Sequence, residues 1–165
     1  MKILAALKKI KHLDRKIENV LKRISKYCSV IVDNENDDAP VYNADDIQKM
    51  QQKVVDWAVE KVKIRTALHL TNVRTKVDWM DGNYSIDNLL LIQNVLMPAQ
   101  MKTLTALRRK EKGGYGNSSS KDSWVIMQYD PKKRDAAIEK AEHSKELLDE
   151  LLDNLNIETD VVGLD

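Results

Sequence analysis

The sequence predicts a mainly α-helical protein: an antiparallel helical bundle or coiled-coil hairpin with a small β-sheet at one end. Over long stretches, apolar residues recur at alternating steps of four and three, the spacing of a helix seam. Two of these stretches are followed by short segments in which apolar and charged residues alternate, as in strands. Apolar residues make up 42% of the 165 residues and charged residues 32%, and Phe is absent. Such a chain should bury its apolar residues as stripes along helices and not in a thick central core. We expect one helical domain over residues 1–165.

The first two predicted helices form a hairpin. The first covers about residues 2–28, and the second runs from about 45 to 70, with an acidic loop over 33–44 between them. Each seam has one polar position, Asp14 in the first and Lys61 in the second. In an antiparallel hairpin these two lie level, so they should form a polar pair that sets the register. The alternative is that both side chains extend into solvent. The other seam residues are Ile3, Leu7, Ile10, Ile17, Leu21, Ile24 and Cys28, then Ile47, Met50, Val54, Trp57, Ile64 and Leu68.

The middle of the chain predicts a strand hairpin and then an interrupted helix. The Asp-Gly step at residues 81–82 is a hairpin signal because such turns need positive φ. Ser85 should cap a third helix over about residues 86–111. Pro98 lies inside that helix, where it removes a donor and clashes one turn back. We therefore expect a kink near residues 94–97, or two helices in place of one.

The last third of the chain begins with a loop and ends with a helix. Residues 112–121 are basic and rich in Gly and Ser, which predicts a flexible loop. Residues 124–127 have the composition of a strand. Asp130 followed by Pro131 is a helix start, and the fourth helix should run to about Leu155.

Two hexapeptides, at residues 72–77 and 156–161, share one pattern with inverted charges. Each follows a predicted helix, so the order helix, hexapeptide, helix, hexapeptide indicates a duplicated plan. Laid side by side as strands, they would place a basic pair opposite an acidic pair. We therefore predict that they join in a small sheet, within one chain or between copies. The residues predicted to pair the strands are Arg74, Lys76, Glu158 and Asp160.

No residue pattern indicates catalysis, a cofactor or a metal. The single cysteine, Cys28, lies in no nucleophile motif, and the three histidines lack the His-x-x-x-His spacing of helical zinc sites. The acidic run 33–38 lacks the glycine and final glutamate of a calcium loop. We expect a protein that is not an enzyme and needs no cofactor.

Charge and hydropathy also limit the partners. Lysines from Lys8 onward interrupt any signal-peptide core, and no apolar stretch approaches the roughly 20 residues of a membrane span. We therefore expect a cytoplasmic or virion-associated protein without a membrane partner. The net charge of +1 gives no overall attraction to nucleic acid, so any such contact must be local.

A local basic patch surrounds the Gly/Ser-rich loop, and it could bind phosphates and stack a base. It could equally be a solvated helix end, or meet the acidic residues of the last helix within or between copies. Those acidic residues are Glu146, Asp149, Glu150 and Asp153. The basic patch consists of Lys102, Arg108, Arg109, Lys110, Lys112, Tyr115 and Lys121.

Several short motifs resemble the septicolysin-like family of small helical proteins of bacteria and phages. They are the helix over residues 1–28, the Asn-x-x-Thr steps at 72–75 and 156–159, the Asp-Gly turn, and the Tyr-Asp-Pro helix start at 129–131. The resemblance implies a mainly helical fold with a small sheet, and it brings no catalytic residues. The family label suggests a toxin, but no segment here has the character of a pore-forming one.

These observations favour a structural protein that self-associates into homo-oligomers or docks to other proteins of an assembly, such as a phage virion or a mobile element. The alternative is an accessory protein that binds nucleic acid through the basic patch. An enzyme assembled from scattered carboxylates and histidines is the weakest of the three hypotheses.

Overall fold

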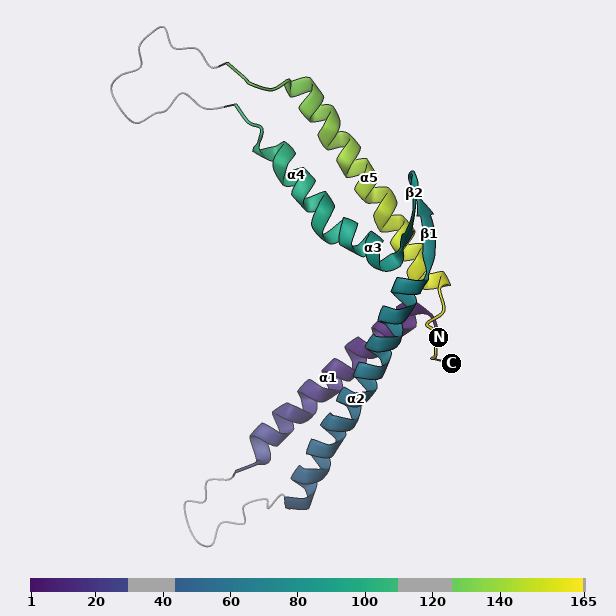
Figure 1. Cartoon of the computed structure of the whole chain (residues 1–165). Helices are drawn as coiled ribbons and strands as arrows, with labels where there is room; N and C mark the ends of the chain where they lie inside the picture. Colours follow the sequence, from purple (N-terminus) through teal and green to yellow (C-terminus); the bar gives the residue numbers. More distant parts are fainter. Residues whose placement is uncertain (30–43, 110–125, 165) are drawn as a thin grey trace, which may run out of the picture. The chain divides into compact units, whose positions relative to one another are not determined.

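A computed structural model describes residues 1–29, 44–109 and 126–164, and it is mainly helical with a small antiparallel sheet, as predicted (Figure 1). The predicted single domain divides into two compact units. Unit 1 comprises Met1–Thr75 and Leu155–Asp165, and unit 2 comprises Lys76–Asn154. Of the loop predicted at 33–44, residues 33–43 lie outside the described residues and Ala44 begins a helix, and the loop predicted at 112–121 lies entirely outside them.

Unit 1 is built on two helices, α1 (Ile3–Tyr27) and α2 (Ala44–Arg74), which lie side by side (Figure 1). The buried stripe of α1 differs from the predicted seam, because Ala6 and Leu13 are buried while Leu7 is exposed. Steps of three, four and three therefore replace the predicted four, three and four at the start of this helix. The buried residues of the two helices are Ile3, Ala6, Ile10 and Leu13, then Met50, Ile64, Ala67, Leu68 and Thr71.

Unit 2 begins with the hairpin of β1 (Lys76–Trp79) and β2 (Gly82–Ser85), which pair antiparallel. Ser85 caps the next helix as predicted, its Oγ accepting a hydrogen bond from the Asn88 N–H at 3.1 Å. The unit continues through α3 (Ile86–Leu91), the π-helical turn η1 (Ile92–Leu96) and α4 (Met97–Ala106). It ends on α5 (Pro131–Glu158), whose last residues belong to unit 1.

The interruption predicted at Pro98 takes the form of the π-helical turn η1. The Met97 N–H bonds to the Ile92 carbonyl, five residues back, so the turn is one residue wider than an α-turn. Proline cannot donate to the carbonyl four residues earlier and clashes with it, and the widened turn lies directly before this point. Of the two predicted alternatives, the structure has two helices in place of one, and the second ends at Ala106, before the predicted residue 111.

The hairpin forms at the Asp-Gly step, but its turn lies one residue earlier than predicted. Trp79 pairs with Gly82, so the loop residues are Met80 and Asp81, and the positive φ of 50° belongs to Met80. Gly82 does not have a positive φ, and the reason for glycine at this position is the close approach of Tyr84. A Cβ at that position would lie 2.6 Å from the ring of Tyr84.

The predicted strand at 124–127 is not present in its described part, since residues 126 and 127 lie outside any helix or strand. Both Ile126 and Met127 are exposed. A strand requires a neighbour for its backbone groups, and the described residues supply none here. Strand-like composition alone was therefore misleading.

The two hexapeptides do not pair with each other within the chain, so this prediction was wrong for a single molecule. Helix α2 continues through Arg74 and α5 through Glu158, which makes the first half of each hexapeptide helical. Beyond the helices, Lys76 pairs with Ser85, and Asp160 forms an antiparallel bridge with Lys2. Each hexapeptide therefore consists of a helix end and a short extended segment. The extended segment pairs with Ser85 in the first case and with Lys2 in the second.

The hexapeptides nevertheless mark a repeat in the structure. The Thr75 and Thr159 N–H groups close the two helices in the same way, with bonds of 2.9 Å and 3.0 Å to the carbonyls of Thr71 and Leu155. Each following residue then pairs with the residue that precedes another helix, Ser85 or Lys2. Counted back from each threonine, the buried residues coincide: Ile64 with Leu148, and Leu68 with Leu152.

Candidate interaction surfaces

The described residues contain no group of three or more His, Cys, Asp or Glu that could hold a metal ion. In the same part of the chain, no helix is long and apolar enough to cross a membrane. Cys28 is exposed, with its Sγ 3.5 Å from the Ser25 carbonyl, and the His143 ring lies 3.9 Å from Glu146 at the surface. None of these side chains forms a catalytic arrangement, so the surfaces and grooves are the candidate functional features.

Lys61 donates a hydrogen bond to Asp14 across the α1–α2 hairpin, the pair that the register predicted. The side chains are 25% and 46% exposed, so the pair lies at the edge of the seam and keeps part of its hydration. Two further contacts flank it, the Lys9–Glu60 ion pair at 2.7 Å and the Lys16 ammonium 5.4 Å from the centre of the Trp57 ring. Together they hold the two helices in one register.

The first and last segments of the described chain join in unit 1. Lys2 Nζ lies 2.7 Å from the Asp160 carboxylate, and its hydrogen bond is the main cause that holds the pKa of Asp160 below its ordinary value. The backbone adds bonds from Ile3 N–H to Thr159 and from Val161 N–H to Met1. Asp160 therefore binds its partner within unit 1, while Lys76 lies in the hairpin and Arg74 and Glu158 end helices.

The outer face of α2 carries an apolar stripe that sequence analysis missed. Val55, Val59 and Val62 are 54%, 49% and 62% exposed, and Val73 continues the line at the end of the helix. The steps of four and three are those of a second seam, about half a turn away from the buried Ile64. The sequence contains this spacing, but the stronger stripe facing α1 hid it.

The described part of the basic patch lies at one end of unit 2. Lys102, Arg108 and Arg109 are exposed at and beyond the end of α4, while Lys110, Lys112, Tyr115 and Lys121 lie outside the described residues. Arg134 joins this end to α5, because its Nη1 donates to the Leu107 carbonyl at 2.7 Å. Its guanidinium also lies 5.8 Å from the centre of the Tyr129 ring. The first turn of α5 thereby adds Lys132 and Lys133, which sequence analysis did not include.

The described residues of the basic patch form no ion pairs with the acidic residues of α5. Asp149 accepts hydrogen bonds from Gln93 at 2.5 Å and from Lys145 at 3.0 Å, which lower its pKa. The basic residues lie beside Arg134, more than three helical turns earlier on α5. Among the described residues the within-chain contact is therefore not formed, and the residues of the patch at 110–121 lie outside them.

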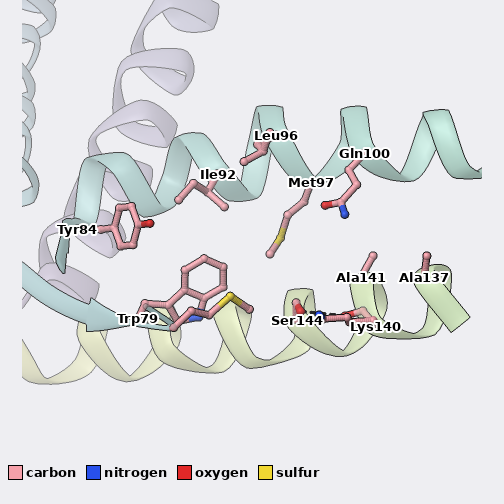
Figure 2. A pocket seen from close by; sticks show the side chains of 11 residues that line it. Trp79, Tyr84, Ile92, Leu96, Met97, Gln100, Ala137, Lys140, Ala141 and Ser144 are labelled. Atoms are coloured by element: carbon pink, nitrogen blue, oxygen red, sulfur yellow. Dashed lines mark hydrogen bonds between the residues drawn. The ribbon is translucent and has the colours of Figure 1, made fainter. Parts of the chain in front are cut away.

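Unit 2 also contains a groove of about 380 Å³ between the η1–α4 segment and α5 (Figure 2). The hairpin closes one end of it with the side chains of Trp79, Met80 and Tyr84. Figure 2 shows Met97 and Gln100 pointing from α4 toward α5, and Ala137 and Ala141 pointing from α5 toward α4. The remaining lining residues are Ile92, Leu96, Lys140 and Ser144.

In the comparison with known proteins, no family model, no curated protein and no solved structure matches the chain. The resemblance to septicolysin-like proteins therefore stays a prediction from short motifs.

Proposed function

We propose that the protein is a non-enzymatic assembly protein that self-associates through the valine stripe of α2. The observation that carries this proposal is a stripe of about half-exposed valines at seam spacing on a helix whose opposite face is already buried against α1. Monomeric proteins rarely expose contiguous apolar surface of this kind without a partner. Such an assembly fits a component of a phage virion or a mobile element.

Charge complementarity favours a second copy of the chain as the partner. Asp56 and Lys63 flank the stripe on the same side, seven residues apart and centred close to Val59. When the stripe meets itself antiparallel across a two-fold axis, Asp56 of one copy lies level with Lys63 of the other, and the axis repeats the pair. The valines fill the seam between the two ion pairs.

Molar mass measured by light scattering on the full chain tests this proposal. The wild type should be a dimer or larger, and Val59→Glu should be a monomer, because the two-fold axis brings the two new carboxylates together. Arg23→Gln changes the net charge by the same amount at an exposed position of α1, which does not carry the stripe, so it should keep the wild-type mass. A wild type that stays monomeric at high concentration, or Val59→Glu with the wild-type mass, would contradict the proposal.

A charge exchange tests the antiparallel arrangement separately. Asp56→Lys alone should weaken association because it places lysines opposite each other, and Asp56→Lys with Lys63→Asp should restore it. If the double variant associates no better than the single one, the stripe does not pair in this way.

The second candidate function is nucleic-acid binding at the basic end of unit 2. Arg108, Arg109, Lys132 and Lys133 gather there around Tyr129, so cations and a ring for base stacking lie together. Binding of a single-stranded oligonucleotide should fall as salt rises, and Arg108→Glu with Arg109→Glu should abolish it. Binding that is unaffected by salt or by this double variant would exclude this function.

A further inference from the structure

We propose that the groove of unit 2 binds a small amphipathic molecule with an apolar body and one acidic head group, such as a medium-chain carboxylate. This proposal is independent of self-association, because the valine stripe lies in unit 1. It depends on the volume and lining of the groove, on the polar side chains at its rim, and on a comparison with the corresponding place in unit 1.

The groove has the size and lining of a ligand site. Its volume of about 380 Å³ lies within the range of roughly 300–1,000 Å³ of small-molecule pockets. Aliphatic, aromatic and thioether side chains form most of its surface. Met80 and Met97 are among them, and methionine adapts to apolar ligands of different shapes because it is unbranched and polarizable.

The hairpin forms a shaped aromatic wall at one end. The Trp79 and Tyr84 rings meet edge to face, with centroids 6.3 Å apart and planes at 70°. Tyr84 can take this position because Gly82 carries no side chain. An apolar chain or ring in the groove would therefore meet an edge-to-face aromatic pair instead of solvent.

Three polar groups at the rim lack partners in the part of the chain that the structure describes. They are the Lys140 ammonium, the Gln100 amide and the Tyr84 hydroxyl, for which no ion pair or side-chain hydrogen bond is formed with another described residue. All three can donate hydrogen bonds, and Lys140 adds a positive charge. A ligand that complements them presents an anionic, hydrogen-bond-accepting head group.

Unit 1 repeats the helix end of unit 2 but carries a larger side chain at the position that corresponds to the groove. Counted back from the threonines that close α2 and α5, Trp57 in unit 1 corresponds to Ala141 in unit 2. Trp57 is half-buried beside α1, with Lys16 over its ring. Unit 2 has alanine there and again at Ala137, so small side chains leave open the space that an indole ring fills in unit 1.

The test follows the indole N–H resonance of Trp79 by NMR while decanoate or decanol is added to the full chain, below the micelle concentration. Trp79 is one of three tryptophans, and replacing it by Phe assigns its peak. Decanoate should shift the peak in a saturable manner, and decanol should do so more weakly because it lacks the charge.

Two pairs of variants locate the site. Lys140→Met should weaken decanoate binding by about two- to fivefold, the effect of one exposed ion pair, and leave decanol unchanged. Ala141→Trp should abolish binding of both, because it fills the groove as Trp57 does in unit 1. Lys133→Met and Ala136→Trp make the same changes on exposed parts of α5 outside the groove, and both should bind like the parent.

Several results would overturn the proposal. They are the absence of a saturable Trp79 shift, equal decanoate affinity of Lys140→Met and the parent, and binding that survives Ala141→Trp. A change in molar mass caused by Ala141→Trp would assign the groove to a second copy instead. Far-UV circular dichroism checks the fold, and Ala137→Leu serves as the filling variant if Ala141→Trp unfolds.

Discussion

Replacing Thr71 with valine should destabilise unit 1 by about 2 kcal/mol, because it removes a hydrogen-bond acceptor from a buried junction. Thr71 is fully buried, and its Oγ1 donates to the Ala67 carbonyl at 2.8 Å and accepts from the Val162 N–H at 2.9 Å. Valine has nearly the same shape as threonine, so packing should survive. The Ala67 carbonyl keeps its helical bond, but the part-buried Val162 N–H loses its partner, and an unsatisfied donor costs about 1–3 kcal/mol where water does not replace the bond.

Serine separates the hydroxyl from the methyl group at this position. Thr71→Ser keeps the acceptor and loses one methyl, for which we expect about 1 kcal/mol. Thr105→Val makes the valine change at an exposed position of α4, where the hydroxyl also bonds a helical carbonyl, and should stay within about 0.5 kcal/mol of the wild type. The expected order of stability is therefore wild type, Thr71→Ser, then Thr71→Val.

Urea unfolding followed by far-UV circular dichroism measures the order, and amide hydrogen exchange at Val162 reports the broken bond directly. Exchange at Val162 should accelerate in Thr71→Val and much less in Thr71→Ser. If Thr71→Val is as stable as Thr71→Ser, or if Val162 exchanges alike in both, the hydroxyl does not anchor the C-terminal segment and the reasoning fails.

Three further predictions concern single contacts. Replacing Asp14 by leucine and Lys61 by methionine together should leave stability within about 1 kcal/mol, whereas a single replacement should cost more, and a double-mutant cycle in urea shows whether the pair is coupled. Met80→Gly should stabilise unit 2 by about 1 kcal/mol by relieving positive φ, and an unchanged or lower midpoint would argue against strain at this residue. Asp160→Asn should be less stable than the wild type above about pH 4, and the difference should vanish as pH falls through the lowered pKa of Asp160; a difference that is constant with pH would show that its charge is not used.

Local signals in the sequence predicted the helices well. Ser85 caps a helix through its own hydrogen bond, and Pro98 interrupts a helix through its own clash and missing donor. Both features could therefore be predicted from single residues. The Asp14–Lys61 contact followed from register, because two adjacent helices leave few ways to align. These features depend on neighbours in the chain or on one simple packing geometry.

Features that depend on distant partners were predicted poorly. The two hexapeptides do carry opposite charges, but this pattern could not show that Asp160 pairs with Lys2 and not with Lys76. The groove arises from the absence of bulk at Ala137 and Ala141 facing α4, and small residues produce no signal of their own. The shift from Leu7 to Ala6 in the buried stripe has the same origin, because the identity of the neighbour decides which of two similar faces is covered.

The bridge between Lys2 and Asp160 has a consequence for the order in which the chain can be built on the ribosome. Unit 1 needs residues from both ends of the chain, whereas unit 2 is one continuous stretch. After α2 emerges, roughly 4–17 s of synthesis must pass, at roughly 5–20 residues per second, before Asp160 can bridge to Lys2. Unit 1 is therefore completed only after unit 2 has been synthesised, and during that interval Ile3 and Thr71 lack the segment at 159–162 that later bonds to them.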